Sequence, residues 1–114
     1  MRFFTTLILL FLMVSLVYSQ NNIYYGNPKK FNNPATLQIS KVISSHPSYP
    51  LLKSYSSEDP DFWLILERIN QEILATIRKV ARERGYDLVG EKGFLKKEMP
   101  DITDEVIENL RRGR

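Results

Sequence analysis

Apolar residues recur at helical spacing through the second half of the chain, and this is its clearest pattern. Asp59 is a favoured N-cap, Pro60 fits the first helical position, and Gly85 is typical of the residue just past a helix C-terminus. Between them, steps of three and four residues place one set of side chains on a single stripe: Phe62, Leu66, Ile69, Ile73, Ile77 and Val80. The sequence therefore predicts one long amphipathic helix over residues 59–84.

Shorter elements are predicted on the N-terminal side of this helix. Residues 35–39 alternate between apolar and polar side chains, which indicates a short, half-buried strand. Val42 and Ile43 suit a helical turn that ends at His46-Pro47, because the residue before proline disfavours the α conformation. Residues 48–58 are rich in serine and are interpreted as a connector, in which Leu51 and Leu52 form an apolar turn.

A second group of short elements is predicted after the long helix. Residues 86–89 and 94–95 are interpreted as the two strands of a hairpin, with a tight turn at 91–93. Thr103 is predicted to cap a closing helix whose apolar face carries Val106, Ile107 and Leu110. The predicted fold class is α+β: a small sheet containing antiparallel strands, one long amphipathic helix and a short C-terminal helix.

The N-terminal part of the chain predicts export. Arg2 supplies a positive charge, residues 3–17 are almost all apolar, and Ser19 places a small residue before a cleavage site at Gln20. We expect a signal peptide over residues 1–19 and a periplasmic location; secretion or an uncleaved signal anchor are the alternatives. Residues 20–34 are rich in asparagine and predict a flexible or loosely docked arm, followed by one domain over residues 35–114.

Composition narrows the classes of function. The chain has no cysteine, which excludes disulfides and thiolate metal sites, and its formal net charge of +3 is too mild to indicate a nucleic-acid partner. A small exported domain without disulfides often gains stability by oligomerising. The long apolar stripe also predicts a partner, because we expect it to be too long for so small a domain to cover. No cofactor is expected.

Several segments together resemble the Skp/OmpH family of periplasmic chaperones. Gly85-Tyr86-Asp87-Leu88-Val89 is similar to a strand of that family, and Asp101-Ile102-Thr103-Asp104-Glu105-Val106-Ile107 to its closing helix. Lys41-Val42-Ile43 and His46-Pro47-Ser48-Tyr49 resemble its N-terminal segment. The resemblance implies a homotrimer with a β-rich head, which binds unfolded outer-membrane proteins without ATP.

The chain departs from the family in the middle. Twelve residues separate Tyr49 from Phe62, where the family has long helical arms that enclose clients. The sequence is therefore interpreted as a chaperone-like protein of reduced capacity. The alternative is a structural or interaction protein of the cell envelope that keeps only the head fold. A secreted enzyme that depends on His46, the single histidine, is the least favoured interpretation.

Two sets of residues are candidates for function. Aromatic and basic side chains of the long helix are the predicted client-binding residues: Phe62, Trp63, Arg78, Lys79 and Arg82. The rest of the stripe (Leu66, Ile69, Ile73, Ile77 and Val80) is predicted to be core or an oligomer interface. The functional interpretation of the cations includes weak contact with an acidic membrane surface, with lipopolysaccharide or with negatively charged clients. The competing interpretation makes the aromatics part of the core or of a subunit interface and the cations a solvated face. His46 is interpreted as structural or exposed, and the acidic residues of the closing helix as a cap and a solvated face. No catalytic or metal site is predicted.

Overall fold

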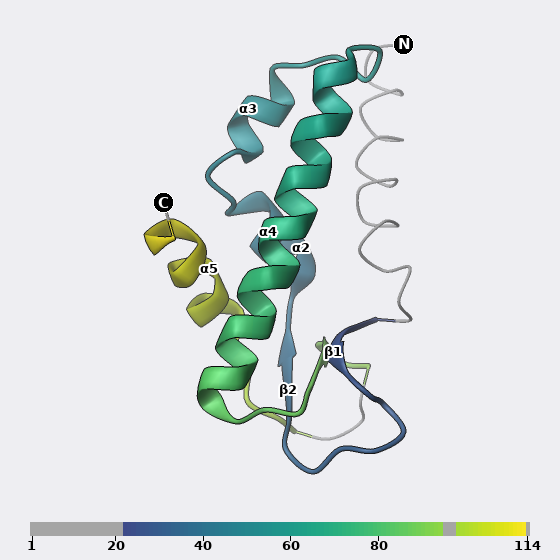
Figure 1. Cartoon of the computed structure of the whole chain (residues 1–114), viewed down its shortest axis with the longest axis vertical. Helices are drawn as coiled ribbons and strands as arrows, with labels where there is room; N and C mark the ends of the chain where they lie inside the picture. Colours follow the sequence, from purple (N-terminus) through teal and green to yellow (C-terminus); the bar gives the residue numbers. More distant parts are fainter. Residues whose placement is uncertain (1–21, 95–97, 114) are drawn as a thin grey trace.

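The computed structural model of the chain describes residues 22–94 and 98–113; the predicted signal peptide lies outside these residues. The elements follow the order β1 (Ile23–Gly26), β2 (Pro34–Leu37), α2 (Ile39–Ser44), α3 (Tyr49–Lys53), α4 (Pro60–Arg84), β3 (Leu88–Glu91) and α5 (Thr103–Arg112) (Figure 1). The predicted α+β class is confirmed, with a three-stranded sheet, one long helix and a short C-terminal helix.

Helix α4 begins and ends where the sequence predicts. The carboxylate of Asp59 accepts a hydrogen bond from the backbone N–H of Asp61 at 2.9 Å, and Pro60 is the first helical residue. Gly85 ends the helix in the left-handed conformation, with φ of 77°. With 25 residues, α4 is about 38 Å long and packs against α2, α3, α5, β1 and β3.

The sheet has β3 at its centre. Strand β3 pairs antiparallel with β1 and parallel with β2, giving the order β1-β3-β2. The predicted hairpin is therefore wrong, because both edges of β3 are already occupied. The predicted turn exists, with the N–H of Phe94 donating to the carbonyl of Glu91 at 2.9 Å, but Phe94 belongs to the turn rather than to a strand. Leu95 lies outside the described residues.

The segment predicted as a loosely docked arm supplies an edge strand. Residues 20–34 contain β1, in which Ile23 and Tyr24 are buried. The hydroxyl of Tyr24 donates a hydrogen bond to the carboxylate of Glu91 at 2.9 Å, which ties β1 to the end of β3. The burial of Ile23 and Tyr24 and the hydrogen bond of the Tyr24 phenol hold this strand in place, although asparagine dominates the composition around them.

Strand β2 is buried on both faces, which corrects the half-buried strand predicted over residues 35–39. Thr36 is 5% exposed because the segment before α5 lies along it. The N–H of Thr36 donates to the carbonyl of Pro100 at 2.8 Å, and the N–H of Ile102 donates to the carbonyl of Thr36 at 2.8 Å. The strand ends at Leu37 because Ile39 already begins α2, where its N–H donates to the carboxylate of Glu91 at 3.0 Å.

Helix α5 begins differently from the prediction. Thr103 is its first helical residue rather than its cap. The carboxylate of Asp101 accepts a hydrogen bond from the N–H of Thr103 at 2.9 Å. The hydroxyl oxygen of Thr103 accepts one from the N–H of Gln38 at 2.9 Å. Thr103 is therefore buried and joins the start of α5 to the end of β2.

The apolar stripe of α4 is buried within the single chain. Phe62 is 6% exposed, Leu66 is 1% exposed, and the other four members are fully buried: Ile69, Ile73, Ile77 and Val80. Helix α3 lies beside the N-terminal half of α4, whereas the sheet and α5 lie beside its C-terminal half (Figure 1). The stripe joins one hydrophobic core with Leu52, Ile43, Val106 and Leu110.

This burial corrects the expectation that the stripe needs a partner. The elements that cover it come partly from segments that the sequence marked as an arm and a connector, namely β1 and α3. The stripe is core, so it gives no reason for a subunit interface. The homotrimer implied by the family resemblance stays a prediction without this support.

Candidate functional site

The two predicted aromatic site residues occupy different environments. Phe62 lies in the core, whereas Trp63 is 40% exposed. Their rings meet edge to face, with centroids 5.2 Å apart and planes at 79°. The indole N–H of Trp63 donates to the carbonyl of Ser57 at 2.9 Å. Of the pair, only Trp63 is placed to touch a partner, and its one polar atom is already bonded within the chain.

An exposed leucine follows Trp63. Leu64 is 61% exposed on the same turn of α4, and the sequence analysis did not single it out. Exposed apolar side chains are common when scattered singly, but adjacent large ones offer a contact for another apolar surface. We refer to Trp63 and Leu64 as the apolar surface. The signal that could have found Leu64 was its position opposite the buried stripe.

The predicted basic residues lie far from Trp63. Arg78, Lys79 and Arg82 are exposed near the C-terminal end of α4, and none forms an ion pair with another described residue. Fifteen to nineteen positions separate them from Trp63, which is roughly 22–28 Å along the helix. The predicted client-binding residues therefore do not form one surface but mark two ends of the molecule.

His46, interpreted from the sequence as structural or exposed, is buried. It is 1% exposed, and its Nδ1 accepts a hydrogen bond from the N–H of Ser48 at 2.9 Å. Its Nε2 lies 2.8 Å from a carboxylate oxygen of Glu72 on α4. Because Nδ1 accepts, the neutral ring carries its proton on Nε2 and donates it to Glu72. The pair joins the turn before α3 to the middle of α4.

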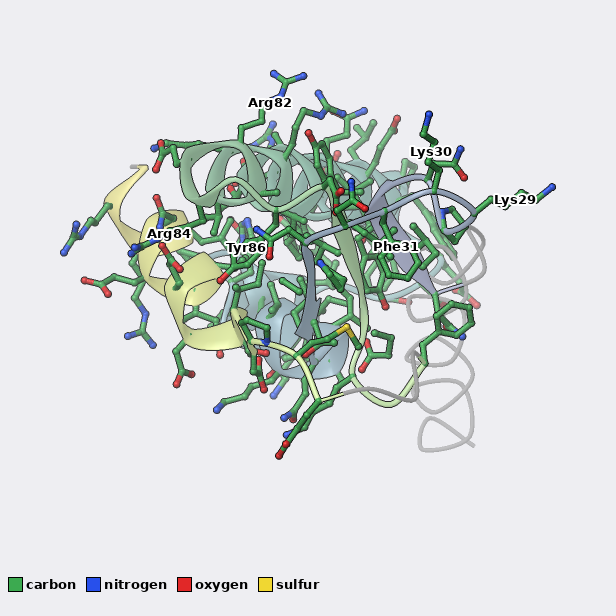
Figure 2. The ribbon with its side chains drawn as sticks, turned by 90° about the horizontal axis from the view of Figure 1, so that it is seen from below. Lys29, Lys30, Phe31, Arg82, Arg84 and Tyr86 are labelled. Atoms are coloured by element: carbon green, nitrogen blue, oxygen red, sulfur yellow. The ribbon has the colours of Figure 1, made fainter. Side chains whose placement is uncertain are left out.

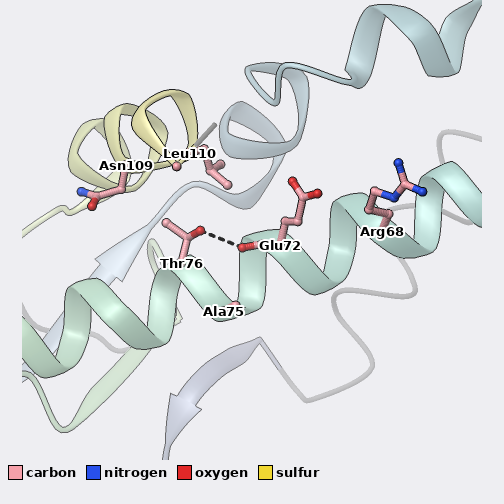
Figure 3. A pocket seen from close by; sticks show the side chains of 7 residues that line it. Arg68, Glu72, Ala75, Thr76, Asn109 and Leu110 are labelled. Atoms are coloured by element: carbon pink, nitrogen blue, oxygen red, sulfur yellow. Dashed lines mark hydrogen bonds between the residues drawn. The ribbon is translucent and has the colours of Figure 1, made fainter.

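A groove of about 380 Å³ lies between α4 and α5 (Figure 3). Its lining is Arg68, Glu72, Ala75, Thr76, Asn109, Leu110 and Gly113. The hydroxyl of Thr76 donates to the carbonyl of Glu72 at 2.7 Å, and the amide of Asn109 donates to the carbonyl of Glu105 at 2.9 Å. Both polar groups are thus bonded to their own helices rather than turned toward a ligand. The lining offers no nucleophile with an adjacent base.

The described residues hold no group of three or more histidine, cysteine, aspartate or glutamate side chains placed to bind a metal ion. Within the same part of the chain, no helix has both the length and the apolar character needed to cross a bilayer. The candidate sites are therefore the apolar surface, the basic end of α4 and the groove beside Glu72.

Comparison with known proteins does not assign this chain to a family. No protein-family model, no curated protein and no solved structure matches this chain.

Proposed function

We propose that the chain is a non-enzymatic interaction protein of the cell envelope, which keeps the head portion of a Skp/OmpH-like fold and binds a protein partner through its apolar surface. The observation that carries this proposal is the exposure of Trp63 and Leu64 on one rigid turn of α4. The buried neighbour Phe62 packs against Trp63 and holds the indole in place. A rigid aromatic side chain loses little conformational entropy on binding, which favours it as an anchor.

The burial of the stripe favours this proposal over a general chaperone. A holdase needs an extended, exposed apolar surface to bind unfolded chains, but the long stripe of α4 is buried in the core. Helix α3 has only 5 residues, so it gives α4 no arm of matching length. A contact as small as the apolar surface suits one fitted partner better than many unfolded clients.

A reduced chaperone is the second candidate, because exposed tryptophan and leucine also suit transient binding of apolar segments. In that case the partners are unfolded outer-membrane proteins, held without ATP in the periplasm. A homotrimer, which the family resemblance implies, would multiply the apolar surface and raise its avidity. Light scattering measures that association state directly.

The experiment that tests the proposal combines affinity capture from envelope extracts with a holdase assay. The variants are Trp63→Ala with Leu64→Ser, and Leu51→Ser as the matched control, because Leu51 is 50% exposed on α3. One stoichiometric partner that the double variant loses and the control keeps supports the interaction protein. Suppressed aggregation of an unfolded β-barrel protein, without a stoichiometric partner, supports the chaperone. Equal capture by the double variant contradicts both.

Trp63 also supplies a direct reading of binding. It is the single tryptophan of the chain, beside six tyrosines. Emission excited selectively at tryptophan therefore reports this side chain, once the spectrum of the partner alone is subtracted. Addition of the captured partner is expected to shift the emission to shorter wavelength, because binding removes the indole from water. An unchanged spectrum at saturating partner concentration would place the contact elsewhere.

A further inference from the structure

The loop between β1 and β2 is fastened to the segment that follows α4. The carboxylate of Asp87 accepts hydrogen bonds from the N–H groups of Asn32 at 2.6 Å and Asn33 at 2.9 Å. In return, the N–H of Asp87 donates to the carbonyl of Asn33 at 3.0 Å, and the side-chain amide of Asn33 donates to the carbonyl of Gly85 at 2.9 Å. These bonds hold the loop beside the C-terminal end of α4.

This attachment brings two lysines to the basic end of α4. Asn27 shapes the loop, since its side-chain oxygen accepts from the N–H of Lys29 at 2.9 Å and its carbonyl accepts from the N–H of Lys30 at 3.2 Å. Figure 2 shows this end of the molecule, with Lys30 and Arg82 pointing to the same side. Residues about fifty positions apart in the sequence thus share one surface.

The cations gathered here are largely uncompensated. We define the basic surface as Lys29, Lys30, Arg78, Lys79 and Arg82; all are exposed, and none pairs with a carboxylate among the described residues. By contrast, the Nε–H of Arg84 donates a hydrogen bond to a carboxylate oxygen of Glu105 at 2.6 Å, and this bond raises the pKa of Arg84. The carboxylates nearest in sequence are Glu83 and Asp87, and the cations outnumber them.

We propose that the basic surface docks the protein on a bilayer that contains anionic phospholipids. Exposed lysine and arginine side chains on long stems reach phosphate groups over a broad plane, and several of them together give a useful attraction. Phe31 and Tyr86 lie at the same end of the molecule, inward of the labelled cations, and are only partly buried (Figure 2). Aromatic rings beside cations suit the headgroup region of a membrane.

A membrane surface fits these observations better than an acidic polypeptide. An extended peptide is usually held by a groove or a sheet edge. The cations of the basic surface belong to no strand and do not line the groove between α4 and α5. The basic surface instead spreads over a loop and the outer face of a helix. This inference does not depend on the proposed function, because the apolar surface lies at the other end of α4.

The test is flotation of the full chain with vesicles of phosphatidylcholine, with and without phosphatidylglycerol. The difference between the two vesicle types measures attraction to lipid charge and cancels any insertion that is independent of it. The triple variant Lys29→Gln, Lys30→Gln and Arg82→Gln is expected to lose roughly 100-fold of the charge-dependent partitioning. The control triple Lys53→Gln, Arg68→Gln and Arg111→Gln has the same net charge and should partition like the unmodified chain.

Three results overturn the proposal. Equal losses in both triples would show that net charge alone drives partitioning. Equal binding to both vesicle types would show that lipid charge has no role. Retention of the unmodified chain on polyglutamate beads, without preference for anionic vesicles, would assign the basic surface to an acidic polypeptide. The Trp63→Ala, Leu64→Ser variant should keep its vesicle binding, which separates this outcome from failure of the proposed function.

Discussion

The Nε2 atom of His46 lies 2.8 Å from a carboxylate oxygen of Glu72, and this contact joins two segments that no sequence pattern predicts to be neighbours. His46 ends the turn after α2, whereas Glu72 lies near the middle of α4. The ring is buried and held on its other nitrogen by the N–H of Ser48. The pair therefore fixes the start of α3, which in turn covers part of α4.

Replacement of His46 by alanine should destabilise the fold. The substitution leaves a cavity and removes the acceptor of the Ser48 N–H, so we expect a loss of about 2–4 kcal/mol in the free energy of unfolding. Urea denaturation followed by circular dichroism measures it. Glu72→Gln keeps an acceptor for the imidazole N–H and should cost less. A His46→Ala variant within about 0.5 kcal/mol of the parent would show that the pair contributes little.

The long helix was predictable because every signal for it is local. The cap at Asp59, the proline after it, the periodic stripe and Gly85 all depend on neighbouring residues, and α4 begins and ends accordingly. Strand partners depend instead on contacts distant in sequence. Nothing near Val89 in the sequence shows that Tyr25 and Ala35 lie on either side of it. Local signals therefore favour a hairpin with residues 94–95, which is wrong.

The candidate site was only partly predictable for a related reason. Helical periodicity places Phe62 on the buried stripe and Arg78 and Arg82 on the exposed face, so the burial of Phe62 argues against its prediction as a client-binding residue. It gives no means of knowing that Lys29 and Lys30 join these cations, because that depends on bonds between Asp87 and the loop. Similarly, the stripe looked unshielded because β1 and α3 have compositions typical of loops.

Substitution of Gly26 tests the placement of β1. Gly26 has φ of 89°, and a Cβ atom added there would lie 2.0 Å from the carbonyl oxygen of Asp87. Gly26→Ala combines backbone strain with a clash against a fixed backbone atom, so we expect it to cost at least about 2 kcal/mol of stability. Thermal or urea unfolding measures the loss.

Gly85→Ala is the matched control for this substitution. Gly85 also has a positive φ, 77°, but nothing lies within 4 Å of an added Cβ atom. Backbone strain alone should lower the free energy of unfolding of Gly85→Ala by about 1 kcal/mol. Equal losses at the two glycines would mean that β1 does not approach Asp87 as closely as described.

Substitutions at Ile73 test whether the stripe of α4 is core or an interface between copies. Ile73 is fully buried in the single chain, so Ile73→Val should cost about 0.5–1.5 kcal/mol and Ile73→Ala about 2–5 kcal/mol. Because no second copy is needed to cover it, the valine variant should keep the molar mass of the parent in light scattering. A fall in molar mass would return the stripe to the role of subunit interface.

Asp87 should make the fold sensitive to acid. Hydrogen bonds from the N–H of Asn32, and then of Asn33, hold the pKa of Asp87 below its ordinary value of 3.8. A carboxyl group with a lowered folded pKa adds stability above the unfolded pKa, and that stability is lost as pH falls through the folded pKa. Asp87→Asn should therefore be less stable than the parent near neutral pH, with the difference closing below about pH 4.

Urea midpoints measured from neutral to acidic pH test this expectation, with Glu83→Gln as the control. Glu83 is an exposed carboxylate near the same end of the molecule, so its removal should leave the shape of the pH profile close to that of the parent. The sign of the stability change at neutral pH is informative, because removing a carboxylate that only repels its neighbours would make the fold more stable. If Asp87→Asn were more stable than the parent at neutral pH, Asp87 would not be the group that holds the loop, and the shared position of Lys29, Lys30 and Arg82 would lose its structural basis.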